Sequence, residues 1–264
     1  MFAHLQQLLR YRALISALVA RELKARYRGS VLGFLWSFVN PLLLLLIYNF
    51  VFTKVMPRAP SEGLEPYALF LFCGLLPWTW FASSLLDSSN VLISGGNLIR
   101  KVMFPAEVLP IVSVFAGLVH YCLGLVVLAA FFVYFGHPVT LANLVWLPVI
   151  VLVQLVLTSG LSLLIAALTV HFRDLRDLLT NLMTLWFFGT PIIYPLTRAP
   201  ESVRWILNLN PFTHLAVSYQ QALFWTEPFG AARRLLVVGA AAVVVFFAGY
   251  FVFDRLRDTL AEEV

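Results

Sequence analysis

Charged residues are scarce in this chain of 264 amino acids: only 12% are Asp, Glu, Lys or Arg, whereas 61% are hydrophobic. A soluble domain has about 25% charged and about 45–50% apolar residues, and a large buried core does not explain so wide a difference. Barrel strands alternate apolar and polar residues over about 10 positions, but the apolar runs here are continuous and longer. We therefore predict an all-α polytopic membrane protein.

Cysteines and catalytic motifs are also scarce. Cys73 and Cys122 both lie in apolar runs, which favours two small core residues over a disulfide. The sequence has no G-x-x-x-x-G-K-[ST], C-x-x-C, H-E-x-x-H or G-x-S-x-G motif, and its five histidines are scattered. These patterns serve nucleotide binding, metal binding and nucleophilic catalysis. We therefore expect no catalytic residue, metal or cofactor on this chain, and no ATP hydrolysis by it.

Long apolar runs are what the chain has in abundance. A helix needs about 20 apolar residues to cross a hydrocarbon core of about 30 Å. Asn40-Pro41 lies within the first run and predicts a kink there. Six runs approach or exceed that length, at about residues 31–53, 67–90, 108–135, 144–170, 178–195 and 235–253. The prediction is a single transmembrane domain, 1–264, with six spans.

The distribution of basic residues predicts the orientation of these spans. Lys and Arg concentrate on the cytoplasmic side of membrane proteins. If both termini are cytoplasmic, 12 of the 18 Lys and Arg residues lie inside and 6 outside. This bias predicts cytoplasmic segments at 1–30 and 254–264. It also accounts for the net charge of +5 without nucleic acid, since basic residues lie between spans, where lipid head groups attract them.

Two further segments are neither plain loops nor full spans. Residues 5–28 have Tyr11, Ile15 and Leu18 at helical spacing, which predicts an amphipathic helix in the membrane interface. Within it, Glu22 and Arg26 form an i,i+4 pair. Residues 196–230 predict two short helices, broken near Asn208 to Pro211, that re-enter the outer leaflet. Irregular backbone at that depth must face protein or water, so this pair is expected to face the interior of an assembly.

Aromatic residues make up 15% of the chain and gather in the first, second and fifth predicted spans. Aromatic rings stack on the C–H faces of sugars, so we expect part of this group to line a glycan conduit, although each ring alone could pack in the core or against lipid. The group comprises Phe34, Trp36, Phe38, Tyr48, Trp78, Trp80, Trp186, Phe187 and Phe188. His120 lies mid-span and is either a functional ionisable group or, as we favour, a neutral imidazole bonded to a neighbouring helix.

Several short motifs occur in order along essentially the whole chain and on consistent sides of the predicted spans. They are Arg21-Glu22-Leu23-Lys24-x-Arg26-Tyr27-x-x-Ser30-x-Leu32-Gly33-x-x-Trp36, Asn40-Pro41, Gly74-x-x-Pro77-Trp78, Leu98-Ile99-x-Lys101-x-x-Phe104-Pro105, Phe172-Arg173-Asp174, Thr190-Pro191-Ile192-x-Tyr194 and Asn210-Pro211. Together they resemble the ABC-2 family of exporter permeases. The most similar branch exports bacterial surface polysaccharides such as O-antigen, teichoic acid and capsule.

This resemblance implies a homodimeric channel in the bacterial inner membrane with two separate ATPase subunits beneath it, which bind ATP and Mg. Contacts to those subunits are implied for Arg21, Glu22, Arg26, Leu98, Ile99, Arg100, Lys101, Phe104, Phe172, Arg173 and Asp174. An outer gate is implied for Pro191, Tyr194, Trp205, Asn210 and Pro211. A pyrophosphate head is implied to meet Arg21, Lys24, Arg26 and Arg28, because Arg binds phosphate bidentately.

The implied cargo is a lipid-linked polysaccharide that moves across the membrane through this permease. Two alternatives remain open from the sequence. One is a permease of the same family for another cargo, such as a drug or a lipid. The other is a polytopic enzyme that acts on lipid-linked sugars.

Overall fold

The computed structural model describes residues 11–55, 64–96, 105–172 and 174–263. Helices dominate these residues, and no strand occurs among them. The helices are α2 (Arg12–Arg26), α3 (Trp36–Phe50), α4 (Tyr67–Ser94), α6 (Val108–Phe135), α7 (Leu141–Leu144), α8 (Leu147–His171), α9 (Leu175–Phe188), α10 (Glu201–Leu209), α11 (Pro211–Leu223) and α12 (Ala232–Glu263). The all-α prediction is therefore confirmed for the described part of the chain.

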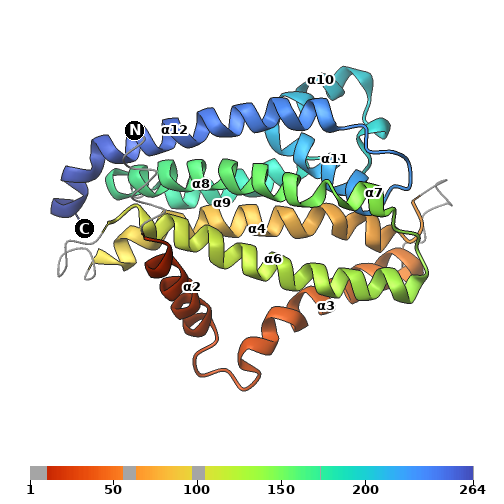
Figure 1. Ribbon diagram of the computed structural model, residues 1–264, viewed down its shortest axis with the longest axis horizontal. Helices are drawn as coiled ribbons and strands as arrows, with labels where there is room; N and C mark the ends of the chain where they lie inside the picture. The colour runs from red at the N-terminus through yellow and green to blue at the C-terminus, as the bar shows by residue number, and fades with distance from the viewer. Residues whose placement is uncertain (1–10, 56–63, 97–104, 173, 264) are drawn as a thin grey trace.

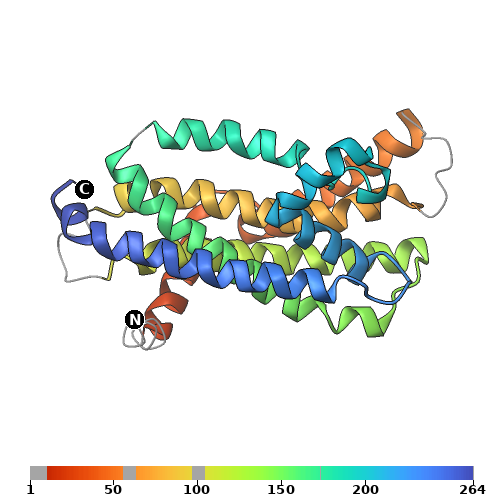
Figure 2. The same cartoon turned by 90° about the horizontal axis from the view of Figure 1, so that it is seen from above.

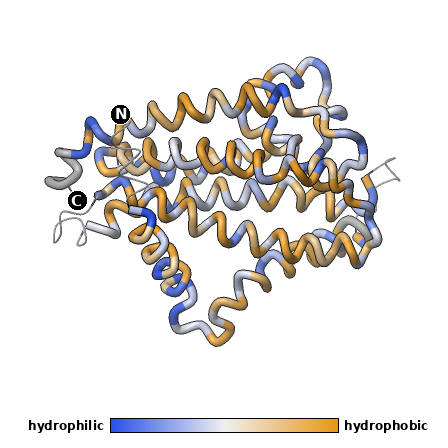
Figure 3. Tube along the Cα trace, in the orientation of Figure 1, coloured by the Kyte–Doolittle hydropathy of each residue, from blue (hydrophilic) through white to orange (hydrophobic). Residues whose placement is uncertain are grey.

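Five helical segments in the described residues are long and apolar enough to cross a membrane. They are Gly33–Phe50, Tyr67–Ser94, Val108–Phe135, Leu141–His171 and Ala232–Arg257. Each overlaps one of the predicted spans, so this is a membrane protein with several spanning helices. The colouring of Figure 3 follows this pattern, because the long helices are mainly hydrophobic and the hydrophilic residues gather toward the ends of the bundle and on α2.

The predicted fifth span, 178–195, corresponds to a shorter helix. Helix α9 has 14 residues, Leu175–Phe188, and at 1.5 Å per residue it is about 21 Å long. The helix ends at Phe188 and is followed by Gly189. It does not continue, because Pro191 lacks the backbone N–H that a further helical turn would need. A sixth complete crossing therefore stays a prediction.

The bundle is built around α4. Helices α4, α6, α8 and α12 run side by side along the long axis of the molecule (Figure 1). Helix α4 has the largest buried share of the five candidate spans. Its Phe70, Phe72 and Phe81 side chains are fully buried, so α4 supplies much of the core. Both described cysteines are free; Cys73 is buried as expected, but Cys122 lies on the outward surface of α6.

Helices α8 and α12 make the closest contact in the bundle. A Cβ atom added to Gly249 would lie 2.1 Å from the carbonyl oxygen of Gly160, and one added to Gly160 would lie 2.5 Å from Cα of Phe246. Only glycine fits at such a backbone-to-backbone approach. The small residues Ser159, Gly160 and Ser162 in the sequence thus mark a helix–helix contact, as is common in membranes.

Helices α2 and α3 form a V that projects from the bundle (Figure 1). Helix α2 packs Leu18 against Val108 and Val112 of α6, with Tyr11 and Ile15 alongside. The apolar stripe predicted for this helix is therefore the face that packs, and residues 5–10 of the predicted 5–28 helix lie outside the described residues. Helix α3 is mostly exposed.

The two ends of the bundle differ. Helix α2 begins, α8 passes to α9, and α12 ends at one end of the molecule, whereas α7, α10 and α11 lie at the other (Figures 1 and 2). The two short helices predicted within 196–230 are α10 and α11, and α11 is packed among α4, α8 and α12. Residues 254–263 of the predicted charged tail continue α12 as helix.

Candidate functional site

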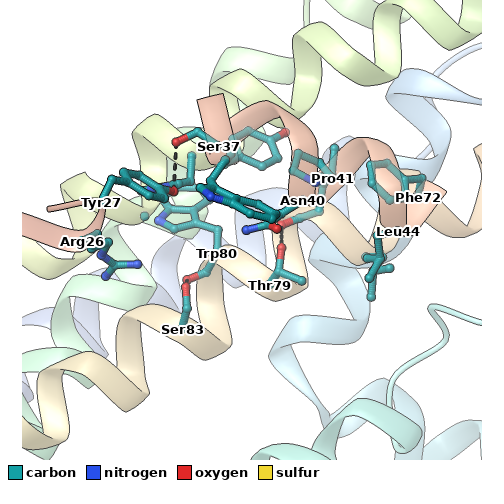
Figure 4. Close-up of a pocket in the computed structure, with 16 residues that line it drawn as sticks. Arg26, Tyr27, Ser37, Asn40, Pro41, Leu44, Phe72, Thr79, Trp80 and Ser83 are labelled. Atoms are coloured by element: carbon teal, nitrogen blue, oxygen red, sulfur yellow. Dashed lines mark hydrogen bonds between the residues drawn. The ribbon is translucent and has the colours of Figure 1, made fainter. Parts of the chain in front are cut away.

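A cavity of about 350 Å³ lies between α2, α3, α4 and α6. Arg26 and Tyr27 lie at one end of it, and Leu44 and Phe72 lie at the other (Figure 4). The residues that line it are Arg26, Tyr27, Trp36, Ser37, Asn40, Pro41, Leu44, Phe72, Leu75, Leu76, Thr79, Trp80, Ser83, Gly117, His120 and Tyr121. The cavity is therefore polar and charged at one end and apolar at the other.

Arg26 carries the charge at the polar end. Its Nε atom lies 3.7 Å from Oε1 of Glu22, one turn earlier on α2, which confirms the predicted i,i+4 pair. Its Nη2 atom also donates to Oδ2 of Asp87 on α4. The side chains of Arg26 and Asp87 are 30% and 41% exposed, so this ion pair is reachable from outside the core.

A chain of hydrogen bonds fixes the wall beside Arg26. The Ser37 hydroxyl donates to the Tyr27 hydroxyl oxygen at 3.0 Å, and Tyr27 Oη lies 2.8 Å from Nε2 of His120. The other ring nitrogen, Nδ1, lies 2.9 Å from the Ala116 carbonyl oxygen. Since a carbonyl only accepts, Nδ1 carries a proton, and a neutral ring would then accept from Tyr27 at Nε2. His120 is therefore bonded to Tyr27, which follows α2, as in the alternative favoured from the sequence; its neutral state stays a prediction.

Most other polar groups of the lining are already bonded. The indole N–H of Trp36 donates to Ser30 Oγ at 2.9 Å, and that of Trp80 donates to the Val114 carbonyl at 3.0 Å. Thr79 and Ser83 donate to carbonyls of their own helix. In the described part of the chain there are two exceptions. The side-chain amide of Asn40 has no partner and faces the cavity (Figure 4), and the buried hydroxyl of Tyr121 has no hydrogen-bond partner.

The aromatic residues predicted for a conduit lie in different environments. Trp36 and Trp80 line the cavity. Trp78 is buried, with its ring centroid 5.1 Å from Phe212, and Trp186 lies 5.3 Å from Phe81 in the same aromatic cluster. Phe187 contacts Trp78. Tyr48 and Phe38 are half-buried, and Phe34 and Phe188 are exposed. Contact of any of them with a sugar stays a prediction.

Among the residues implied for an outer gate, Asn210 is the one that joins two helices by its side chain. Its Oδ1 accepts from the Trp186 indole at 2.8 Å and from the Phe212 backbone N–H at 2.9 Å, so it caps α11. Its Nδ2 donates to Thr190 Oγ1 at 2.9 Å. The network joins the end of α9 to the start of α11, where Pro211 occupies the first turn. Of the other implied gate residues, Pro191 accepts from Gln220, Tyr194 donates to the Phe188 carbonyl, and Trp205 is exposed.

The residues implied for ATPase contact are only partly described. Arg21 and Glu22 border a second hollow between α2, the end of α4 and the start of α6. Phe172 and Asp174 are exposed at the turn into α9. Leu98, Ile99, Arg100, Lys101, Phe104 and Arg173 lie outside the described residues. Of the four residues implied for a phosphate head, Arg26 alone lines the cavity between α2, α3, α4 and α6; Lys24 and Arg28 are exposed.

Sequence reasoning missed the partners of Arg26 and Tyr27. Asp87 is 61 positions from Arg26, and His120 is 93 positions from Tyr27. The available signals were an acidic residue and an imidazole in otherwise apolar helices, which need internal partners in a membrane.

Comparison with known proteins assigns this bundle to a class. The model of the ABC-2 type transporter family matches residues 13–224. The chain belongs to the ABC-2 type transporter family.

Several curated proteins resemble this ABC-2 transporter chain over most of its length. It is 41% identical over 261 residues to the O-antigen export system permease protein RfbA of Myxococcus xanthus, covering 98% of each chain. It is 32% identical over 249 residues to the protein of the same name from Klebsiella pneumoniae, covering 94% of each. The polysialic acid transport protein KpsM of Escherichia coli is 22% identical over 210 residues, covering 79% of this chain and 80% of KpsM.

Proposed function

We propose that this chain is the permease subunit of an ATP-driven exporter that moves a lipid-linked bacterial surface polysaccharide of the O-antigen kind across the inner membrane. The observation that carries this proposal is the similarity, over 98% of both chains, to a permease named for O-antigen export. The several apolar helices long enough to span a membrane support it.

The energy for transport comes from outside this chain in our proposal. The sequence contains no phosphate-binding loop, and ABC-2 relatives are named as transport components. We therefore propose two separate ATPase subunits that bind ATP and Mg, docked on α2 and on the turn at Phe172 and Asp174. Both features lie at one end of the bundle (Figure 2), where we place the cytoplasm and both termini.

The conduit itself is formed by two copies of the chain in this proposal. Helix α9, continued by the residues after Gly189, completes a sixth pass, and α10 with α11 forms the outer gate around Asn210. The basic residues of α2 meet the phosphate of the lipid carrier as it enters.

Deletion of the gene tests the cargo. Loss of surface polysaccharide with accumulation of lipid-linked glycan inside the cell is the expected result, and a plasmid copy of the chain restores export. Unchanged surface polysaccharide with altered drug tolerance would assign the permease to another cargo. Turnover of a lipid-linked sugar by the purified chain alone would make it an enzyme.

A further inference from the structure

The cavity between α2, α3, α4 and α6 changes character along its length. Arg26 and Asp87 form an ion pair at its mouth, Ser37 and Asn40 follow on α3, and Leu44 and Phe72 close the far end (Figure 4). A ligand that matches this order has a charged head, a hydrogen-bonding group next to it and a hydrocarbon chain. An amphipathic lipid has this form.

The charges at the mouth favour an anionic head. Residues 21–28, which lead along α2 to the mouth, contain four basic side chains, Arg21, Lys24, Arg26 and Arg28, and one acidic side chain, Glu22. Asp87 of α4 is the other acidic residue paired with Arg26. Arg26 is the only one of the four that lines the cavity. A guanidinium matches the geometry of phosphate oxygens and binds them through paired N–H groups.

The ion pair with Asp87 is suited to exchange. Both side chains are partly exposed, and an exposed ion pair contributes little net stability in its own right. A phosphate carries more charge and more acceptor oxygens than a carboxylate. It can therefore replace Asp87 as the partner of Arg26, after which Asp87 faces solvent at the mouth.

Two neighbouring features suit this exchange. The Asn40 amide faces the cavity without a partner in the described residues, and an amide N–H₂ group can donate to a second phosphate oxygen. Tyr27 is held by Ser37 and His120. The backbone beside Arg26 is thus anchored, and only the Arg26 side chain has to move.

We infer that this cavity binds the phosphate-bearing end of the lipid carrier, and that the Asp87 carboxylate is paired with the Arg26 guanidinium until the phosphate displaces it. The assignment of the lipid to the cargo rests on the proposed function. Asp87 is in this view an internal competitor that tunes affinity for the head group, and the arrangement lies within one copy of the chain.

The test measures binding of farnesyl pyrophosphate to the full chain in nanodiscs of phosphatidylcholine, without an ATPase partner. Arg26→Gln is expected to weaken binding about tenfold or more, because it removes charge-assisted hydrogen bonds. Asp87→Asn is expected to tighten binding about threefold, because it removes the competing charge. The matched controls, Arg12→Gln on the same helix and Asp254→Asn on α12, are expected to change the Kd less than twofold.

If the two residues of one ion pair change the Kd in opposite directions, the phosphate competes with Asp87 for Arg26. A purely structural ion pair would give changes in the same direction. Equal weakening by Arg26→Gln and Asp87→Asn would overturn the inference, as would a loss in Arg12→Gln as large as that in Arg26→Gln. Should Asp87→Asn fold poorly, Asn40→Asp leaves the ion pair intact and is expected to weaken binding about tenfold by repulsion; unchanged binding in that variant would also overturn the inference.

A second lipid distinguishes binding of the lipid carrier from binding of an ordinary membrane phospholipid. Replacing part of the phosphatidylcholine with phosphatidylglycerol is expected to leave farnesyl pyrophosphate binding within twofold. Abolished binding would assign the cavity to an ordinary anionic phospholipid and overturn the cargo assignment. Because this assay needs neither export nor ATP, its failure leaves the surface-polysaccharide test of the proposed function standing.

Discussion

A single hydroxyl group, that of Tyr27, links the end of α2 to α3 through Ser37 and to α6 through His120. Tyr27→Phe leaves both of those groups without this partner, at a cost of about 1–3 kcal/mol for unsatisfied polar groups. We expect a lower midpoint of thermal unfolding for the purified protein. Tyr134→Phe is the matched control, since Tyr134 is 79% exposed on α6; equal midpoints for the two variants would contradict the role of the Tyr27 hydroxyl.

Asn210 is the second residue on which several bonds depend. Asn210→Ala removes the cap of α11 and the acceptor of the Trp186 indole, and a lost cap costs about 1 kcal/mol. We expect reduced thermal stability and faster proteolysis at the α10–α11 junction. Asn208→Ala keeps the backbone carbonyl that bonds His214, so it is expected to behave like the unmodified protein; a stable Asn210→Ala variant would refute the proposed link.

At the residue scale, local spacing predicted local bonds and failed for distant ones. The Glu22–Arg26 pair follows from one helical turn, and a bonded His120 follows from the cost of an unpaired polar group in a membrane. The Asp87 and Ser37 contacts depend on how α2 and α3 lie against the bundle. No periodicity within either helix encodes that placement.

At the scale of elements, the close approach of α8 and α12 leads to a prediction about their packing. Gly249→Ala places a Cβ 2.1 Å from the Gly160 carbonyl, and overpacking of this kind costs about 1–3 kcal/mol or more. We expect a large loss of folded protein in detergent, measured by size-exclusion chromatography. Gly239→Ala on the same helix meets only Val153 at 3.5 Å and is expected to fold normally; similar yields for both variants would show that the helices can separate.

The turn into α9 leads to a prediction about coupling between this chain and the proposed ATPase subunits. Asp174 is exposed there and its side chain caps nothing, so Asp174→Ala should not unfold the protein. We expect the complex with the ATPase subunits to lose most glycan-stimulated ATP hydrolysis and export. Asp177→Ala, one turn further on, is the control; full stimulated activity in the Asp174→Ala complex would remove this turn from the proposed docking surface.

Apolar runs predicted the long helices, whereas the sixth crossing that they also predicted stays a prediction. The expected spans 67–90 and 108–135 correspond to α4 and α6, because no proline or glycine pair ends either helix early. Residues 178–195 were also apolar, but Gly189 and Pro191 end α9 after 14 residues. The predicted tail has no such break, and α12 continues through it.

For the whole molecule, the proposal implies that the chain cannot transport by itself. We expect the purified protein in lipid vesicles to move no lipid-linked glycan when ATP is added, and to move it when the ATPase subunits are also present. Vesicles with the ATPase subunits alone serve as the control. Movement of glycan by the chain alone would contradict a permease that depends on a partner for its energy.

The shared location of the start of α2 and the end of α12 has a practical consequence. Because both lie at one end of the bundle (Figures 1 and 2), two copies can be fused head to tail through a short hydrophilic tether that never crosses the lipid. Such a tandem polypeptide allows a lesion to be placed in one half only. Transport by tandem polypeptides with one altered half then shows whether a single intact half is sufficient.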